Sequence, residues 1–398
     1  LAEALPAEGC VLARRGWAGG KSGLFEHPSK SLLCLLATTV LRCRSGFREF
    51  LASLVMQLSE FNFPFDSSLI ATEPVLPREQ ARLLVLTPSD RSLAHYRIAD
   101  LPDLLAPGDL LIVNETKVRA ARVMGRKRPS GKLVEILFVK PVAERNWEVL
   151  MKGTWRVGTV IDVDVESNLT VLSREAGRTV VRIEGTVPIP DFFQRYGRMP
   201  LPPYIKRLPT DQDRDWYQTV FAKNEGAIAA PTAGLHFSPA LLTRLMDRKI
   251  ELAKVTLHVG VGTFKPVTAD RIEDHQMGAE WVDIGAETVR TIERTKQAGG
   301  MVVAVGTTVV RALESAAREP GELRPYQGET SLFITPGFDF RVVDALLTNF
   351  HLPQTTLLML VSAFAGVEFL REAYKEAVRE RYRFYSYGDA MLITNRKR

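Results

Sequence analysis

The chain has 398 residues, of which 45% are hydrophobic and 25% charged, with a formal net charge of +6. This composition is typical of a folded protein with room for two domains, and it excludes a low-complexity or highly charged disordered chain. The modest positive charge permits an anionic partner without demonstrating one. All three cysteines lie before residue 56, which argues against a disulfide or thiolate metal site in the rest of the chain and favours a reducing compartment.

Residues 1–55 differ from the rest of the sequence. They begin with Leu1 and contain one short apolar run, SLLCLLATTVL, which is too short to span a bilayer. We expect a poorly ordered N-terminal extension, read from upstream sequence, with Met56 as the start; a targeting segment is the alternative.

Two patterns divide the chain after residue 55. Residues 56–118 contain a short helix candidate, a turn at Pro107-Gly108 and the buried strand DLLIVN. Residues 119–190 then contain short β-rich runs separated by turn residues: KLVEILFVKP, NWEVLMKG, TVIDVDV, NLTVLS and RTVVRIEG. Regular short strands without helices predict an inserted β domain, either a small barrel or a sandwich.

Residues 191–398 alternate strands with helices. The strand KVTLHVGVGTF follows the helix PALLTRLMDR, and the strand MVVAVGTT leads into the helix VVRALESAAR. This alternation predicts an α/β domain, formed with residues 56–118, in which helices cover both faces of a mostly parallel sheet.

Four segments share one design, an apolar strand followed by a short loop of small or polar residues: PTAGLHF, HVGVGTF, AVGTT and TNFHLP. Ligands of open α/β sheets bind where such loops converge, at the carboxyl ends of the strands. In PTAGLHFSP, Ser238 fits a helix N-cap and Pro239 the first helical position. Helix N-termini of this kind offer free backbone N–H groups to an anion.

Histidines stand in three of these loops, as His236, His258 and His351. Each on its own fits a structural role, but three at the ends of strands in one sheet favour a shared site. Their spacing matches no HxH or HExxH metal motif, so we expect acid, base or hydrogen-bond roles and no metal.

Other polar residues near strand ends each leave two interpretations open. Arg311 either reaches an anion at a helix N-terminus or forms a surface ion pair with Glu314. Asp389 is either a ligand-binding carboxylate or a turn aspartate, and Asn114-Glu115-Thr116 is either a loop of the site or a simple turn. The glycine-rich loops match neither GxGxxG nor the P-loop pattern, and GxSxG is absent.

Two basic runs are candidates for phosphate contacts with RNA. They comprise Arg119, Arg122, Arg126, Lys127, Arg128 and Lys132 in the first run, and Lys206 and Arg207 in the second. The alternative for each is a solvated turn, and no closely interleaved aromatic residues indicate base stacking.

Several long motifs in order resemble one family, the S-adenosylmethionine:tRNA ribosyltransferase-isomerases of queuosine biosynthesis. They are GDLLIVNETKVRAARVMG, LPPYIKR, APTAGLHFSPALL, LHVGVGTFKPV, AVGTTVVRALES, GETSLFITPGFDFRVVDALLTNFHLPQTTLLMLVSAFAG and YRFYSYGDAMLI, from about Met56 to the C-terminus. The resemblance implies an α/β domain with an inserted β-barrel. It also implies transfer and isomerisation of the ribosyl part of S-adenosylmethionine onto 7-aminomethyl-7-deazaguanine at the tRNA wobble position, which yields epoxyqueuosine-tRNA, adenine and methionine.

The resemblance further implies a consumed cosubstrate, no permanently bound cofactor and no metal. We expect catalytic roles for His236, His258 and His351, without assigning acid or base. Substrate binding is expected from Asn114, Thr116, Pro231, Thr232, Ala233, Gly234, Leu235, Gly260, Gly262, Thr263, Phe264, Gly306, Thr307, Thr308, Arg311, Asn349 and Asp389. RNA binding is expected from Arg126, Lys127, Arg128, Lys206 and Arg207.

The sequence departs from the family pattern in places. Gly278 and Ala279 stand where the family usually has His-Ser, Asn114-Glu115-Thr116 replaces the usual NDT, and Thr308-Val309-Val310-Arg311 replaces TSVR. Two alternatives stay open: another S-adenosylmethionine- or nucleoside-using transferase, and a non-catalytic tRNA-binding protein whose β insert carries the binding. We expect a monomeric, cytoplasmic protein that does not associate with membranes.

Overall fold

The computed structural model describes residues 57–63, 66–175, 178–260, 262, 267, 271–317 and 322–396. The predicted N-terminal extension, residues 1–55, lies outside the described residues, and so do all three cysteines. Within the described part, no helix is long and apolar enough to cross a membrane.

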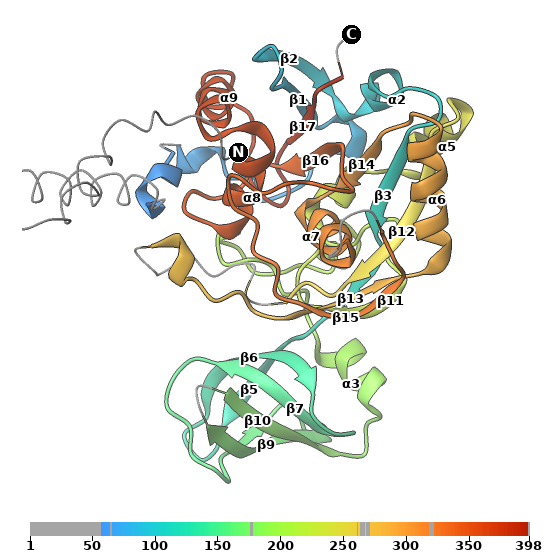
Figure 1. The fold of residues 1–398 in the computed structure, drawn as a ribbon. Helices are drawn as coiled ribbons and strands as arrows, with labels where there is room; N and C mark the ends of the chain where they lie inside the picture. Colours follow the sequence, from blue (N-terminus) through green and yellow to red (C-terminus); the bar gives the residue numbers. More distant parts are fainter. Residues whose placement is uncertain are drawn as a thin grey trace, which may run out of the picture. The chain divides into compact units, whose positions relative to one another are not determined.

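A nine-stranded sheet with the order β15-β13-β12-β3-β14-β16-β17-β1-β2 forms the larger part of the structure (Figure 1). Its centre is parallel, because β12, β3, β14 and β16 pair in one direction. The strands span Arg82–Thr87 (β1), Ser92–Arg97 (β2), Leu110–Asn114 (β3), Glu251–Leu257 (β12), Glu280–Ile284 (β13), Val302–Val305 (β14), Tyr326–Thr330 (β15), Ala345–Asn349 (β16) and Ala390–Thr394 (β17).

The predicted α/β class is confirmed, but the sheet is mixed rather than mostly parallel. Antiparallel pairs join β13 to β12 and β15, β17 to β16, and β2 to β1, whereas β17 and β1 are parallel. The β1–β2 pair shows the physical reason: residues 88–91 form a turn too short for the crossover that a parallel connection requires.

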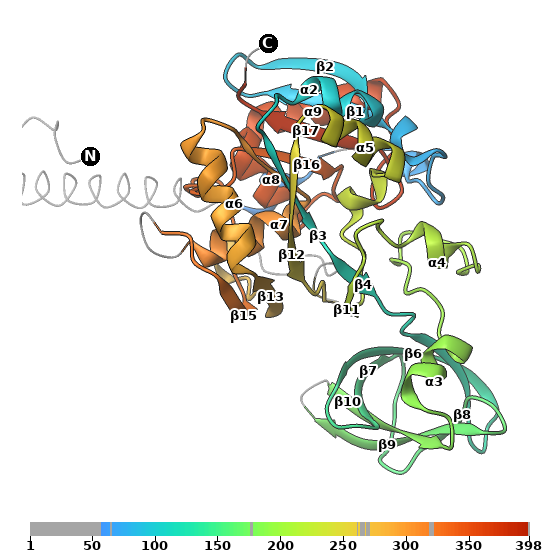
Figure 2. The same cartoon turned by 90° about the vertical axis from the view of Figure 1, so that its right-hand side faces the viewer.

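Helices lie on both sides of the sheet. Leu241 and Leu245 of α5 pack into one core with Leu111 and Val113 of β3, while α6 and α7 lie on the other side of these strands (Figure 2). Every residue of β3 is buried, as expected for a strand covered on both faces. The helices span Leu101–Leu104 (α2), Ile189–Tyr196 (α3), Asp213–Trp216 (α4), Pro239–Asp247 (α5), Ala286–Gln297 (α6), Thr307–Ala316 (α7), Thr356–Ala365 (α8) and Val367–Arg379 (α9).

A closed six-stranded barrel interrupts this domain, in the order β10-β7-β6-β5-β8-β9. Its strands are Arg122–Lys127 (β5), Lys132–Pro141 (β6), Asn146–Met151 (β7), Val160–Asp162 (β8), Ser167–Glu175 (β9) and Arg178–Gly185 (β10). Alternate strand residues fill the interior, and Phe138 and Trp147 pack there against Phe192 and Phe193 of α3. The predicted β insert is therefore a barrel and not a sandwich.

The chain enters and leaves the barrel through a narrow junction. The short strand β4 (Thr116–Val118) pairs in parallel with β11 (Asn224–Ala227) just before the barrel begins. On the return path, Arg198 forms a bridge with Arg122 of β5. The barrel is thus inserted directly after β3, a strand at the centre of the large sheet.

Candidate functional site

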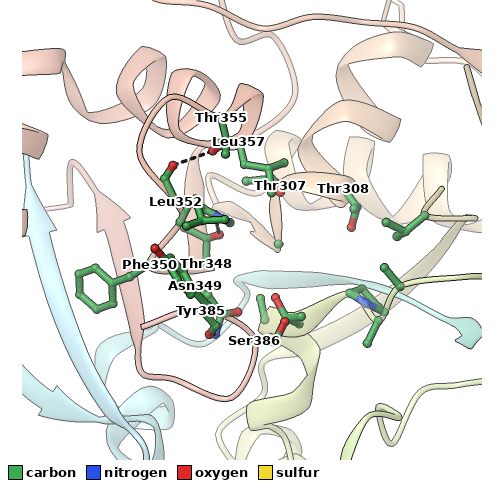
Figure 3. Close-up of a pocket in the computed structure, with 18 of the residues that line it drawn as sticks. Thr307, Thr308, Thr348, Asn349, Phe350, Leu352, Thr355, Leu357, Tyr385 and Ser386 are labelled. Atoms are coloured by element: carbon green, nitrogen blue, oxygen red, sulfur yellow. Dashed lines mark hydrogen bonds between the residues drawn. The ribbon is translucent and has the colours of Figure 1, made fainter. Parts of the chain in front are cut away.

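A pocket lies at the carboxyl ends of β14 and β16, where all four predicted loops contribute lining residues (Figure 3). It is lined by Tyr204, Ala229, Ala230, Pro231, Thr232, Ala233, Val259, Gly306, Thr307, Thr308, Thr348, Asn349, Phe350, His351, Leu352, Thr355, Leu357, Tyr385 and Ser386. None of these described lining residues carries a formal charge at neutral pH. Its place at the strand ends is the one expected for a ligand site in an open α/β sheet.

The turn from β14 into α7 forms one wall. Gly306 has a φ of +97°, a conformation that L side chains rarely adopt, and an added Cβ lies 3.5 Å from the Cβ of Ala233. Helix α7 begins at once with Thr307 and Thr308, and no side chain caps its N-terminus. The first turn of α7 therefore brings free backbone N–H groups to the pocket.

The segment PTAGLHF forms a second wall as the 3₁₀ helix η5 (Thr232–His236). Pro231, Thr232 and Ala233 line the pocket. The predicted N-cap is confirmed, because the Ser238 hydroxyl accepts a hydrogen bond of 3.1 Å from the N–H of Leu241. η5 ends at His236, and the Ser238 cap begins α5 at Pro239, directly after the segment that lines the pocket.

The three predicted histidines have different surroundings, and only His351 lines the pocket. Its Nε2 lies 2.8 Å from Thr348 Oγ1, and its backbone N–H donates to the Tyr374 hydroxyl at 2.8 Å. Burial lowers the pKa of His351 to about 3, so its imidazole is neutral at physiological pH.

His236 lies behind the pocket wall rather than in it. Its Nε2 is 3.2 Å from the Asn349 amide nitrogen, and its side chain is buried. Desolvation by burial is the main cause that lowers its pKa to about 4, with a smaller contribution from Arg78. The structure therefore joins His236 to the site through Asn349.

His258 lies outside the pocket lining. Its Nδ1 is 2.8 Å from Thr116 Oγ1, and burial lowers its pKa. The ring lies flat against Gly226, where a Cβ atom would come within 2.6 Å of it. Asn114, two residues before Thr116, donates to Thr308 Oγ1 at 3.3 Å, so Asn114 and Thr116 support the site without lining it.

The loop after β12 contributes to the pocket through Val259. The next residue, Gly260, donates its backbone N–H to Glu280 at 2.8 Å, and Gly262 is exposed. The predicted ligand residues Thr263 and Phe264 lie outside the described residues.

Arg311 is buried and does not line the pocket, and the alternative interpretation, a surface pair with Glu314, is wrong. Its guanidinium forms an ion pair with Glu280, which is also buried, and donates to the carbonyl of Leu332 at 3.0 Å. Burial raises the pKa of Glu314, whose carboxylate accepts the backbone N–H groups of residues 341–343. The sequence could not show Glu280 as the partner, because Glu280 lies on β13 and Arg311 on α7.

Asp389 also makes its contacts within the protein. Its carboxylate accepts the backbone N–H groups of Arg82 at 2.9 Å and Arg383 at 2.7 Å, and desolvation by burial raises its pKa. It does not line the pocket. These contacts match the alternative interpretation, an aspartate that closes a turn.

Most of the first basic run lies in the β5–β6 hairpin of the barrel, whereas Arg119 precedes β5 and pairs with Glu225 at 2.7 Å. Arg126, Arg128 and Lys132 are exposed, and Lys127 and Lys132 are direct cross-strand partners. Like charges in such a pair repel each other, so an anion bound here relieves repulsion. Arg128 also pairs with Asp162 at 2.6 Å, and Lys127 Nζ lies 4.9 Å from the Trp155 ring centre.

The second basic run is divided. Lys206 is exposed, whereas Arg207 donates to both carboxylate oxygens of the fully buried Asp213 at 2.7 Å each. A bidentate pair of this kind holds a guanidinium in place. Arg207 therefore anchors the loop before α4, and Lys206 is the freer cation of the two.

Sequence reasoning selected residues of the four strand-end loops and a few polar residues nearby, and it missed several lining residues. The missed residues are Tyr204, Ala229, Ala230, Val259, Thr348, Phe350, Leu352, Thr355, Leu357, Tyr385 and Ser386. Most stand in the quoted motifs, such as LPPYIKR and FYSYGD, so motif membership was the available signal. Across the described ranges, no group of three or more His, Cys, Asp or Glu residues could hold a metal ion.

The chain matches the family model described as "Queuosine biosynthesis protein" over residues 58–393. It is 49% identical over 348 residues to an S-adenosylmethionine:tRNA ribosyltransferase-isomerase of Xanthomonas oryzae, covering 86% of this chain and 98% of that protein. A protein of the same name from Aquifex aeolicus is also 49% identical, over 85% of this chain and all of its own length.

Among solved structures, an S-adenosylmethionine tRNA ribosyltransferase from Thermotoga maritima is 37% identical, with a TM-score of 0.49 over 84% of this chain and 99% of that chain. The family match spans the α/β domain, the barrel and every loop of the pocket. The chain thus belongs to the queuosine biosynthesis protein family.

Proposed function

We propose that this protein is an S-adenosylmethionine:tRNA ribosyltransferase-isomerase. It transfers and isomerises the ribosyl moiety of S-adenosylmethionine onto 7-aminomethyl-7-deazaguanine in tRNA and releases adenine and methionine. The observation that carries the proposal is the match to relatives of this name over 98–100% of their length, with all pocket loops inside the matched range.

The uncharged pocket suits S-adenosylmethionine, which brings its own sulfonium, ammonium and carboxylate groups. Free N–H groups in the first turn of α7, at Thr307 and Thr308, are suitable donors to a carboxylate. The aromatic faces of Tyr204, Phe350 and Tyr385 suit a cation or a flat base.

The reaction needs a proton acceptor near the ribose. The sulfonium acidifies the adjacent ribose methylene, adenine then leaves, the aminomethyl nitrogen of the tRNA base attacks, and an epoxide closes as methionine departs. His351 is the histidine placed for this role, because it lines the pocket as a neutral imidazole. In this proposal His258 acts through Thr116, and His236 acts through Asn349.

The barrel hairpin supplies the contacts to the tRNA backbone. Arg126, Lys127, Arg128 and Lys132 concentrate positive charge on two strands, and phosphates neutralise such clusters in nucleic-acid complexes. The proposal includes no resident cofactor or metal, a monomeric state and a cytoplasmic location, and these remain predictions.

One incubation tests the proposal: the protein, S-adenosylmethionine and tRNA that carries the aminomethyl base. We expect free adenine, methionine and the epoxide-bearing nucleoside by mass spectrometry. S-adenosylhomocysteine as the product would instead indicate methyl transfer, and tRNA binding without any product would indicate a binding protein.

Alanine variants of His351 and His258 test the assignments within the site. We expect His351→Ala to abolish adenine release while S-adenosylmethionine still binds. His258→Ala serves as the comparison, since His258 does not line the pocket. Full activity of His351→Ala would remove this residue from the mechanism.

A further inference from the structure

Asn349 stands at the carboxyl end of β16, where it lines the pocket with 2% of its surface exposed. Its amide nitrogen lies 3.1 Å from the carbonyl oxygen of Tyr385, 3.5 Å from that of Asp389 and 3.2 Å from His236 Nε2. Carbonyl oxygens can only accept hydrogen bonds, so the two carbonyls determine which end of the amide is the NH₂ group. The side chain is therefore held in one orientation.

The other end of the amide has no partner. Asn349 Oδ1 is buried and has no hydrogen-bond donor within the described part of the chain. Buried polar atoms in folded proteins almost always have a partner, and an exception calls for an explanation. Because Asn349 lines a ligand pocket, the explanation with the fewest assumptions is a donor on the ligand.

The neighbours of Asn349 indicate the kind of ligand group. The Tyr385 and Tyr204 rings lie 4.8 Å apart, and the Tyr204 hydroxyl is 2.7 Å from Ser386 Oγ, so these two aromatic side chains are held together beside the pocket. Aromatic side chains next to a hydrogen-bond acceptor form a common arrangement for a heteroaromatic base with an amino group.

We propose that Asn349 Oδ1 accepts a hydrogen bond from the exocyclic amino group of a purine-like base, and that His236 is a positioning residue that keeps the Asn349 amide in this orientation. The base is either the adenine of S-adenosylmethionine or the 7-deazaguanine of the tRNA. This inference rests on the proposed function and assigns a specificity-determining role within the same pocket.

His236 fits a positioning role better than direct catalysis. It does not line the pocket, and its Nε2 must be unprotonated to accept from the Asn349 amide. Burial keeps the imidazole neutral at physiological pH. A side chain that places an acceptor near the Asn349 amide should therefore substitute for His236, whereas an apolar side chain should not.

The test compares Asn349→Leu with the wild type in two measurements. The first is calorimetric binding of S-adenosylmethionine and of its analogue that lacks the 6-amino group, both without tRNA. The second is the KM for tRNA at saturating S-adenosylmethionine. Loss of one hydrogen bond to a buried acceptor predicts a weakening of about 10- to 100-fold.

The two arms distinguish the sources of the base. If adenine is the partner, Asn349→Leu weakens S-adenosylmethionine binding and leaves binding of the analogue unchanged. If the tRNA base is the partner, S-adenosylmethionine binds normally and the KM for tRNA rises by the same factor. Unchanged values in both arms, or equal weakening for S-adenosylmethionine and its analogue, overturn the proposal.

His236 is tested by rescue. We expect His236→Leu to weaken the same constant as Asn349→Leu, though by less because the two carbonyl acceptors remain, and His236→Gln, which keeps an acceptor, to restore it at least partly while kcat stays near the wild-type value. Equal loss in both variants argues for a purely structural or catalytic role and overturns the positioning assignment.

Two controls complete the design. Asn224→Leu removes an asparagine whose amide contacts Glu115 and Thr256 outside the pocket lining, and it should leave both constants unchanged. Melting temperatures without ligand identify variants that fail to fold. If wild-type protein releases no adenine, the proposed function itself fails; if it does and the variants match it, only this inference fails.

Discussion

The barrel carries an excess of positive charge, whereas the pocket of the α/β domain is lined by uncharged side chains. The barrel segment, residues 122–185, contains 12 Lys and Arg against 8 Asp and Glu, whereas residues 56–121 and 186–398 together contain 33 against 34. The described pocket lining contains no formally charged side chain. The positive charge that follows residue 55 is therefore concentrated in the inserted barrel, and the ligand pocket relies on shape, backbone N–H groups and hydrogen bonds.

This division separates two recognition problems within one chain. Phosphate contacts depend on charge and weaken with salt, whereas a small zwitterionic ligand requires correct placement of neutral groups. Substitutions in the two regions should then change different measured quantities.

The largest expected effect comes from the buried pair behind the pocket. Arg311→Met leaves the Glu280 carboxylate buried without its cation, which should lower the free energy of unfolding by about 3–5 kcal/mol. Chemical denaturation measures this loss, and Arg311→Lys provides a milder variant if Arg311→Met does not fold. Arg128→Met, which breaks an exposed barrel pair with Asp162, should be indistinguishable from wild type. If Arg311→Met and Arg128→Met lower the free energy of unfolding equally, the distinction between the buried pair and the exposed pair is contradicted.

The next effect concerns the barrel hairpin. Replacing Arg126, Lys127 and Lys132 by Ser should weaken tRNA binding by about 10- to 100-fold at low salt and reduce the slope of log K against log salt by about three. Binding of S-adenosylmethionine should not change. Filter binding across a salt series and calorimetry provide the two measurements.

The matched control removes equal charge from the α/β domain. Arg244, Arg290 and Lys375 are exposed, and their replacement by Ser should leave most of the tRNA affinity intact. If both triple variants lose the same affinity, the barrel is not the preferred phosphate-binding surface.

The loss of stability at acidic pH should come from the α/β domain, since no histidine lies in the barrel segment. The pKa values of His236 and His351 are about 4 and about 3 in the folded protein, below the unfolded value of 6.5. The unfolded chain then binds more protons below pH 6.5, so stability is full above that pH and falls as the pH decreases. Each of the two histidines should lower the free energy of unfolding by about 1.4 kcal/mol when the pH falls from 7.5 to 5.5.

Denaturation at the two pH values measures this loss. His236→Gln removes one titrating group and should flatten the dependence by its share. A dependence that stays as steep in the variant would show that other groups are responsible.

The smallest effect is expected at a helix cap. Ser238→Ala removes the acceptor for the Leu241 N–H and should cost about 1 kcal/mol of stability without changing the KM for S-adenosylmethionine. Thr355→Ala removes a similar cap, the acceptor for Leu358 N–H, but Thr355 also lines the pocket. It should therefore raise KM as well, and an unchanged KM would remove Thr355 from the ligand site.

Local signals were enough for much of the fold. The inserted β domain follows from its regular short strands separated by turn residues, and the cap at Ser238 follows from the Ser-Pro pair that precedes a helix. The strand-to-loop pattern also indicated where the pocket lies, since all four loops contribute to its lining. The antiparallel margins were missed, because strand order depends on contacts between distant segments.

Contacts between distant residues account for what the sequence left undecided at the site. Asn349 and His236 are 113 positions apart, and Arg311 and Glu280 are 31 apart. No local pattern reports such pairs, so the sequence offered only an anion at the helix N-terminus or Glu314 on the same helix as partners of Arg311. By itself, the sequence determined the element types, the inserted β domain and the uncharged loops, because these depend on residues close together in the chain. Only the tertiary structure decided which histidine lines the pocket and which one holds another residue, because burial and pairing arise when the sheet brings distant loops together.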